Sequence, residues 1–199
     1  MPEGHPLAPV TLQDAHVTLE PLTLEHVPAL ERAAADGELW KLWFTSVPAP
    51  GGMTGYVEAA LRGQVEGHML PFAVRERASG EIVGCTRYCH YDPGVPHIEI
   101  GYTWYAQRWQ RSHVNTHCKH LLLDYAFEVL GCAAVVLCTD RYNVASQRAI
   151  ERLGAQRDGI LRAHRRRPDG TIRDTVIYSI TANDWPDVQR LLTWKMDRG

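Results

Sequence analysis

Basic side chains gather at the starts of two predicted helices, where they are placed to bind an anion. Arg108, Arg111 and Lys119 lie around the first start, and Arg148 lies within the second helix. A helix start presents unpaired backbone N–H groups and the positive end of the helix dipole, so it favours negative charge. A strand followed by a polar loop and such a helix therefore predicts a phosphate-binding site. An ordinary β-α-β crossover with a solvated basic loop explains the same residues.

The two helix starts belong to one continuous unit of strands and helices between Ile98 and Gly154. Its first part mixes apolar, aromatic and β-branched residues, as a largely buried strand does. A polar loop, a helix with one apolar face, a short apolar strand and a second helix follow, and Asn143 is the expected N-cap of the last. The predicted bounds are 98–105, 106–113, 114–129, 133–138 and 145–153, in that order.

The rest of the chain adds strands and helices around this unit. We predict helices where apolar residues recur with the helical period, and strands where β-branched and aromatic residues lie between turn residues. The predicted strands are 17–22, 71–77, 81–88, 155–167 and 171–181, the last two joined by Pro168-Asp-Gly170, and the predicted helices are 23–35, 54–68 and one that begins at Asp184. This order implies a mixed α/β sheet with helices on its faces.

Two segments of the central unit resemble the GNAT superfamily of acyl-CoA-dependent N-acyltransferases, and most of all its branch of ribosomal-protein N-terminal acetyltransferases (RimJ/RimL-like). The first is 110–116, where the superfamily has Gln/Arg-x-x-Gly-x-Gly/Ala and its amides bind the coenzyme A pyrophosphate. Gln110 matches the opening position, whereas His113 and Asn115 stand where glycine and glycine or alanine are usual. A side chain at position 113 either obstructs a phosphate or contacts it directly. The second segment, 143–154, matches with an Asn, a Ser three residues on, and then Arg-Ala-Ile-Glu-Arg-Leu-Gly.

The resemblance extends, in the order of elements, over nearly the whole chain. It implies an α/β (α+β) fold with a mixed, mostly antiparallel twisted sheet of six to seven strands, helices on both faces, and a single domain over residues 1–199. Two central parallel strands splay apart in that fold, and the pantetheine arm of the cofactor lies between them. Here they would be the strand that ends near Tyr105 and the strand 133–138.

The resemblance also implies acetyl-CoA as the co-substrate and no metal. Its binding residues are expected at the end of the central strand, in the loop after it and at the second helix start. The candidates are Trp104, Tyr105, Gln110, Arg111, Ser112, His113, Val114, Asn115, Thr116, Lys119, Asn143, Ser146 and Arg148.

Acetyl transfer to an amine needs a group that takes the proton of the amine, donors for the carbonyl oxygen, and stabilisation of the leaving thiolate. The candidate oxyanion donors are the backbone amides near Trp104 and Tyr105. For the thiolate we expect the Ser146 hydroxyl, with Asn143 holding the pantetheine, positioning Ser146 or only capping the helix. Glu99 is the first candidate for the base, directly or through water, although a cross-strand ion pair explains it equally. Further candidates are His97, His113 and Tyr142.

Composition narrows the class of protein. A chain of 199 residues with 45% hydrophobic and 22% charged residues is typical of one globular domain. A net charge of −2 argues against wholesale capture of nucleic acid. No apolar run approaches the roughly 20 residues that span a bilayer, and residues 1–7 do not resemble a secretory signal. We therefore expect a cytoplasmic protein, and the resemblance adds a homodimer.

Several features have two interpretations. Cys85 and Cys89 share a strand face beside His90, and buried free thiols explain them better than a metal site. The aromatic residues of 38–50, which include Trp40, Trp43 and Phe44, either line an acceptor pocket or form a small hydrophobic cluster. The basic segment from Arg162 to Arg167 is either a solvated hairpin tip or a contact for an acidic acceptor or a nucleic-acid phosphate.

Two rival functions follow from these features. The unusual loop 111–113 is compatible with a degenerate relative that binds acyl-CoA without turnover. The basic hairpin is compatible with an RNA-associated protein. Neither the P-loop signature nor a Gly-x-Ser-x-Gly elbow occurs in the chain, which disfavours the corresponding NTPase and hydrolase classes.

Overall fold

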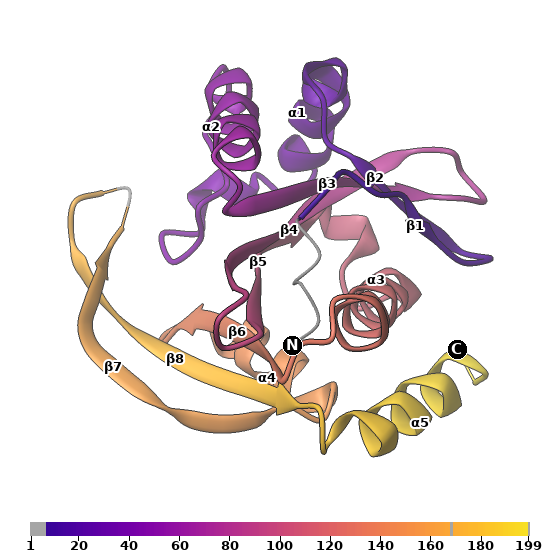
Figure 1. The fold of residues 1–199 in the computed structure, drawn as a ribbon. Helices are drawn as coiled ribbons and strands as arrows, with labels where there is room; N and C mark the ends of the chain where they lie inside the picture. Colours follow the sequence, from indigo (N-terminus) through magenta and orange to yellow (C-terminus); the bar gives the residue numbers. More distant parts are fainter. Residues whose placement is uncertain (1–6, 168, 199) are drawn as a thin grey trace.

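A single twisted sheet organises the computed structural model, which describes residues 7–167 and 169–198 (Figure 1). Within this part of the chain the strand order is β1-β2-β3-β4-β5-β6-β8-β7. Neighbouring strands are antiparallel except for β5 and β6, which are parallel. The strands are β1 Leu12–Gln13, β2 Val17–Pro21, β3 Met69–Glu76, β4 Ile82–Asp92, β5 His97–Tyr105, β6 Ala134–Asp140, β7 Gln156–Arg166 and β8 Ile172–Thr181.

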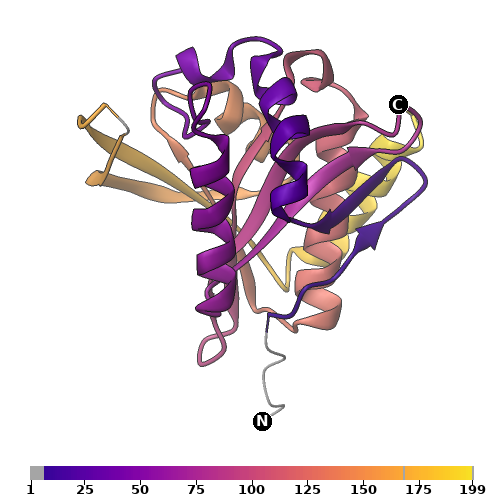
Figure 2. The same cartoon turned by 90° about the horizontal axis from the view of Figure 1, so that it is seen from above.

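Helices cover both faces of the sheet, and each face has its own hydrophobic core (Figures 1 and 2). One core lies beneath two helices, α1 and α2, and contains Leu30 and Val57. The other packs α3, α4 and α5 against the opposite face and contains Leu122, Ile150 and Leu192. The helices are α1 Val27–Ala35, α2 Met53–Val65, α3 His113–Asp124, α4 Val144–Arg152 and α5 Trp185–Met196.

The predicted fold class is confirmed, and the predicted elements are present with small differences in their ends. The sheet has one strand more than the upper predicted number because β1 was not predicted. That strand has only two residues, too few for an alternating pattern, and it is placed by a turn. In this turn the Asp14 carboxylate accepts the N–H groups of His16 and Val17, at 2.7 and 2.9 Å.

The helix predicted over 114–129 also differs in detail. It begins at His113, since Ser112 caps it, and after Asp124 it continues as a π-helical segment, Tyr125–Val129. No helix in the described ranges is both long and apolar enough to cross a membrane. Two predictions fall partly on residues outside those ranges, namely the absence of a signal in residues 1–7 and the turn that contains Pro168.

The two central parallel strands part soon after they meet. Strand β5 pairs with β6 only at His97, Ile98 and Glu99, although both strands continue beyond this point. On its other edge β5 carries a bulge, where the register with β4 shifts between Cys85 and Arg87. The bulge bends β5 away from β6, since such an insertion increases local twist. The predicted separation of the two strands is therefore present.

Candidate functional site

A cavity of about 900 Å³ occupies the region where β5 and β6 part. Its walls are residues 99–105 of β5, residues 137–140 of β6, the first half of α3, helix α4, and residues of the β7–β8 hairpin. The hairpin projects beyond the rest of the sheet (Figure 2), and it closes the side of the cavity that β6 leaves open. Because the cavity follows the unpaired part of β5, an extended ligand in it would meet free strand backbone.

The structure brings most of the predicted site residues to this cavity. Those that line it are Glu99, Trp104, Tyr105, Gln110, Arg111, Asn115, Lys119, Asn143, Ser146 and Arg148. Those that are not among its lining residues are Ser112, His113, Val114 and Thr116. The four are near the first turn of α3, so any part they take in binding falls to their backbone amides.

The start of α3 is held in a fixed conformation. The Ser112 hydroxyl donates to the Trp109 carbonyl oxygen at 2.6 Å and accepts the N–H of Val114 at 3.3 Å. Arg111 lies in the left-handed region, with φ of 59°. The Gln110 amide donates to the carbonyl oxygen of Tyr105 at 3.0 Å and so joins the loop to the end of β5. The remaining first-turn N–H groups are the free donors of any helix start.

The His113 imidazole does not obstruct the cavity. Its ring packs against His16, His117 and Trp109, with centroid distances of 5.5, 5.7 and 6.1 Å. Its Nε2 lies 3.8 Å from a carboxylate oxygen of Glu76. Burial, His117 and His16 lower the pKa of His113. The expectation that this side chain meets a phosphate, as an obstacle or as a contact, is therefore wrong.

His97 and Tyr142, the remaining candidates for the base, also do not line the cavity. The His97 ring is bonded to the Val95 carbonyl oxygen at 2.8 Å. Tyr142 is largely exposed and packs against Trp43. Glu99 is thus the one residue among the four base candidates that lines the cavity.

Glu99 occupies the last paired position of β5 before the strands part, opposite Cys89 of β4 and Val136 of β6. Its carboxylate lies 3.5 Å from Arg165 and 3.9 Å from His90. The side chain is only 9% exposed. Glu99 therefore has an ion pair, although its partner Arg165 lies on β7 and not on a strand adjacent to β5 as a cross-strand pair requires. The pair leaves Glu99 in the cavity lining, so an ion pair and a role as base are compatible.

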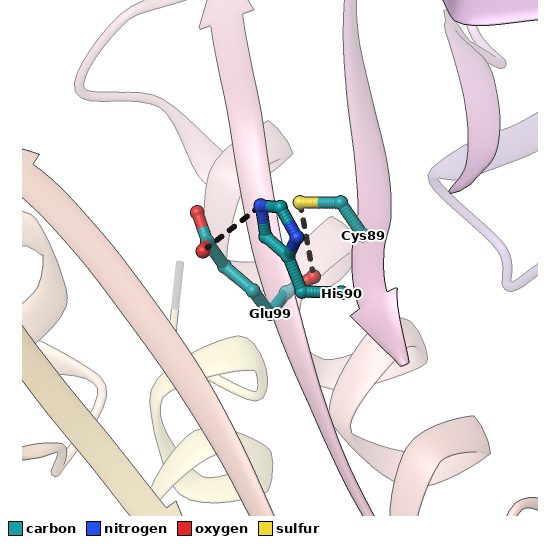
Figure 3. A group of neighbouring side chains, drawn as sticks. All are labelled: Cys89, His90 and Glu99. Carbon is teal, nitrogen blue, oxygen red and sulfur yellow. Dashed lines mark hydrogen bonds and ion pairs between the residues drawn. The ribbon is translucent and has the colours of Figure 1, made fainter. Parts of the chain in front are cut away.

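Cys89, His90 and Glu99 form a group that could hold a metal ion, with ligand atoms within 4.8 Å of one another (Figure 3). The hydrogen bonding favours a different interpretation. The Cys89 thiol donates to the backbone oxygen of Glu99 at 3.7 Å, and burial raises the pKa of this thiol. Arg165 already provides a positive partner for the carboxylate. A protonated thiol and an existing ion pair fit a polar network better than a cation site.

The start of α4 carries Asn143 and Ser146 on the cavity wall. The Asn143 side-chain oxygen accepts the N–H of Ser146 at 3.0 Å, so the predicted N-cap is present. No described residue forms a hydrogen bond with the Ser146 hydroxyl, which leaves it free for a ligand.

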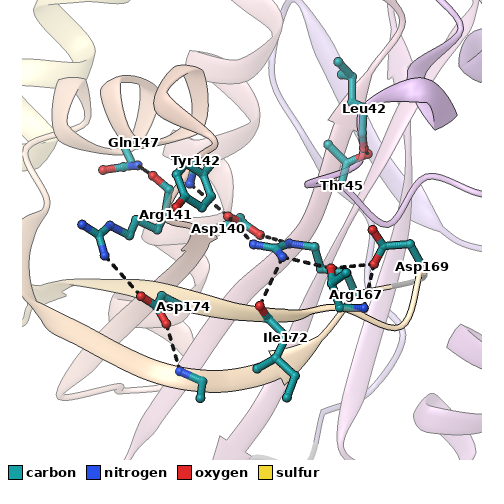
Figure 4. Close-up of polar contacts among 12 residues, drawn as sticks. Leu42, Thr45, Asp140, Arg141, Tyr142, Gln147, Arg167, Asp169, Ile172 and Asp174 are labelled. Atoms are coloured by element: carbon teal, nitrogen blue, oxygen red, sulfur yellow. Dashed lines mark hydrogen bonds and ion pairs between the residues drawn. The ribbon is translucent and has the colours of Figure 1, made fainter.

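A buried ion pair fixes this helix start to the hairpin (Figure 4). Arg167 donates to both carboxylate oxygens of Asp140, at 2.8 and 3.4 Å, and both side chains are almost fully buried. The same carboxylate accepts the N–H of Tyr142 at 2.9 Å. The Arg167 guanidinium also stacks on the Trp43 ring, 4.7 Å from its centroid. One arginine therefore joins α4, the hairpin and the loop after α1, so the solvated-tip interpretation is wrong for Arg167.

The aromatic segment 38–50, in the loop after α1, agrees in part with each predicted interpretation, an acceptor pocket and a small hydrophobic cluster. Phe44 lines the cavity, together with Leu42 and Val47. Trp40 instead packs against the core beneath α1 and α2. Five basic residues of the cavity lining were not among the predicted site residues, namely Arg152, Arg165, Arg166, Arg167 and Arg173. For three of them, Arg165 to Arg167, contact with an acidic acceptor was one of the two interpretations of the hairpin. For Arg173 the sequence offered one indication. It lies two residues before Thr175 in a predicted strand, so the two side chains face the same side of the sheet.

Lys119 is a buried cation without a carboxylate partner in the described part of the chain. Its Nζ donates to the Thr103 hydroxyl at 2.8 Å, and this hydroxyl is in turn bonded to that of Thr86 at 2.7 Å. Burial lowers the pKa of Lys119 to about 8. A cation kept at this position on the cavity wall at a cost in stability is typical of a ligand contact.

We expect Lys119→Met to stabilise the protein near pH 7 and to lose this advantage in alkali. The pKa is about 8 in the folded protein against an ordinary value of 10.5. Below pH 8 the folded state therefore contains a desolvated ammonium, and the stability of the wild type rises as pH rises from about 8 to 10.5. Near pH 7 the substitution should increase the free energy of unfolding by about 1–3 kcal/mol.

Denaturant unfolding at pH 7 and at pH 10.5 measures both values. Lys41→Met is the matched control, because Lys41 is exposed and bonded to the exposed Glu38, and it should change little at either pH. An equal effect of Lys119→Met at both pH values would contradict the assignment of a buried, charged lysine.

Comparison with known proteins gives consistent results. A family model described as an acetyltransferase (GNAT) domain matches residues 16–156. The chain is 28% identical over 113 residues to YoaA of Bacillus subtilis (strain 168), which is described as an uncharacterized N-acetyltransferase. This match covers 56% of the chain and 62% of YoaA, so the chain spans less than two thirds of the length of this relative. It is 36% identical to a T. thermophilus protein assigned as an acetyltransferase, with a TM-score of 0.81 and coverage of 94% and 97% of the two chains. Mycobacterium smegmatis RimJ, solved in complex with CoA-disulfide, has the same fold, with a TM-score of 0.79, 21% identity and coverage of 96% and 97%.

Proposed function

The chain belongs to the family of GNAT acetyltransferase domains, and from this premise we propose that it moves the acetyl group of acetyl-CoA to a primary amine by direct attack in a ternary complex. The observation that supports this best is the cavity between β5 and β6, with a basic helix start at one end and Glu99 in its wall. Holding donor and acceptor side by side supplies much of the rate of such a reaction without a covalent intermediate.

The cofactor would lie with its pantetheine arm along the unpaired part of β5. Its pyrophosphate would meet the first-turn amides of α3, with Gln110, Arg111 and Asn115 beside them and Arg148 on the facing helix. Lys119 would donate to a polar group of the same arm.

The direction of the peptide groups at the end of β5 supports one backbone amide as the donor to the thioester carbonyl. The Ala106 N–H donates to the Val83 carbonyl oxygen of β4 at 2.8 Å. The Trp104 carbonyl also faces β4, since a Cβ at Gly84 would lie 2.0 Å from its oxygen. Strand alternation therefore directs the Tyr105 N–H toward the gap, where it would stabilise the oxyanion. The Ser146 hydroxyl would then protonate or stabilise the leaving thiolate, and Glu99 would take the proton of the amine.

Release of free thiol from acetyl-CoA in the presence of primary amines tests the proposal. We expect amine-dependent thiol release, with saturation in both substrates, and acetylated product by mass spectrometry. Binding of acetyl-CoA, seen as a rise in the melting temperature, without thiol release from any acceptor would instead support a non-catalytic acyl-CoA-binding protein.

The contacts of the hairpin do not favour the RNA-binding alternative. Arg162 is paired with Asp174, and Arg167 is paired with Asp140. Arg165 lies against Glu99 and lines the cavity. A nucleic-acid surface would need these cations free and outward.

We also propose a cytoplasmic homodimer, on the basis of the resemblance to the RimJ/RimL-like branch. Light scattering of the purified protein should give twice the mass of the chain. Protein N-termini and small amines remain the two classes of acceptor.

A further inference from the structure

The cavity beside Glu99 has more positive charge than its own acidic residues neutralise. Within the described part of the chain, its lining contains two acids, Glu99 and Asp140. Asp140 is already bound to Arg167 through both carboxylate oxygens. Glu99 therefore remains as the one free counter-charge for Arg165 and Arg173, which face each other across the β7–β8 pair and both line the cavity.

Arg173 is the unpaired member of this pair. Arg165 reaches the Glu99 carboxylate at 3.5 Å, whereas Arg173 has no hydrogen bond or ion pair from its side chain to any residue in 7–167 or 169–198. Its Nε is buried without a partner. Burial and the neighbouring Arg165 lower the pKa of Arg173. Leaving a buried N–H without a partner costs free energy, because this N–H has lost its hydration and gained no hydrogen bond in return.

The arginines of the segment 162–167 all have partners within the chain, and Arg166 among them donates to the Gly170 carbonyl oxygen at 2.7 Å, which makes Arg173 an exception beside them. Arg162 and Arg141 both bind Asp174, and Arg167 binds Asp140. Arg173 therefore has the properties of a group that awaits an anion from outside the chain. That anion cannot be the cofactor pyrophosphate if the phosphates lie at the start of α3, since Arg173 belongs to the hairpin wall next to the proposed base.

We propose that the amine acceptor carries a carboxylate or a phosphate close to its amino group, and that Arg173, with Arg165 beside it, binds this anion while Glu99 receives the amine. The inference rests on the proposed function, because it assigns the acceptor side of that site. Arg165 touches the Glu99 carboxylate, so the anion and the amine are separated by few bonds. Amino acids with a free carboxylate and aminoalkyl phosphates meet this condition. Polyamines and aminoglycosides do not, because their additional cations would face the arginines.

Matched acceptor pairs test this selectivity. We would measure kcat/KM by thiol release for β-alanine against propylamine, for O-phosphoethanolamine against ethanolamine, and for spermidine. The anionic member should be favoured roughly 10- to 100-fold, the contribution of one or two hydrogen bonds to a charged group. The pair with the larger preference distinguishes a carboxylate from a phosphate. Turnover of propylamine and ethanolamine without any preference for the anionic member would overturn the inference and leave the proposed function intact.

Substitutions assign the preference to the arginine. Arg173→Gln should abolish the preference for the anionic member of each pair, Arg173→Lys should retain part of it, and Arg173→Glu should turn it toward spermidine. Arg162→Gln is the matched control, because Arg162 belongs to the same hairpin but is exposed and paired with Asp174. A preference that survives Arg173→Gln in a folded variant would overturn the inference.

If no acceptor is turned over, the proposed function fails. The inference about Arg173 is then tested by the binding of the anionic amines alone. The melting temperature of the acetyl-CoA-loaded protein should then rise with O-phosphoethanolamine or β-alanine in the wild type but not in Arg173→Gln. Absence of such a shift in the wild type would overturn the inference as well.

Discussion

Replacing Glu99 by glutamine should lower kcat for acetyl transfer roughly 10²- to 10⁴-fold, the usual contribution of a positioned general base. Glutamine keeps the shape of the side chain and its place opposite Cys89 and Val136, but it cannot accept the proton of the amine. The KM for acetyl-CoA should change little, because the cofactor would lie along β5 beyond this residue. Steady-state kinetics with propylamine as the acceptor measures both constants.

The ion pair with Arg165 requires a control, since its loss alone could impair the site. Arg165→Gln breaks the same 3.5 Å contact and leaves the carboxylate in place. With propylamine, which carries no anionic group, it should retain most of the wild-type kcat. If both variants lose activity equally, Glu99 has a structural role only.

Replacing Asp140 by alanine should have the largest effect on stability. It leaves the Arg167 guanidinium buried without a counter-charge, which typically costs about 3–5 kcal/mol. For a chain of this size that corresponds to a fall in melting temperature of roughly 6–20 °C. The change also removes an acceptor for the N–H of Tyr142, next to Asn143. We therefore expect the KM for acetyl-CoA to rise in the same variant, because the start of α4 is no longer held.

Two further variants separate the buried pair from ion pairs in general. Asp187→Ala breaks a fully exposed i,i+3 pair with Arg190 and should cost less than about 1 kcal/mol. Adding Arg167→Met to Asp140→Ala should recover part of the stability, since the unpaired charge is then removed. If Asp140→Ala melts within a degree or two of the wild type, the ion pair does not join α4 to the hairpin.

The sequence predicted the fold well because its signals are local. Alternation, turn residues and helix caps such as Asn143 each act over a few positions, and the order of elements then restricts the topology. The resemblance to the GNAT superfamily is confirmed by the family match, and RimJ of Mycobacterium smegmatis has the same fold. The strand β1 was not predicted because its two residues are too few to show the alternation of apolar and polar side chains that indicates a strand.

The site was predicted less completely, because side-chain direction depends on geometry that sequence does not contain. Positions near 110 were correctly placed at a helix start, but the rotation of α3 about its axis directs His113 away from the cavity and Lys119 toward it. Arg173 was not predicted, because the register between β7 and β8 determines what lies beside it. For Arg167 neither predicted interpretation, a solvated tip or a contact for an external anion, included the ion pair with Asp140, since that partner is distant in sequence.

The early end of pairing between β5 and β6 has a consequence for how long the protein survives in a cell. A donor molecule lying in that opening would act as the missing strand and satisfy backbone groups that are otherwise left to solvent. Each tenfold excess of donor over its dissociation constant then adds about 1.4 kcal/mol to the free energy of unfolding. Abundance of the enzyme would therefore follow the supply of activated acetyl groups, since degradation acts on the open form.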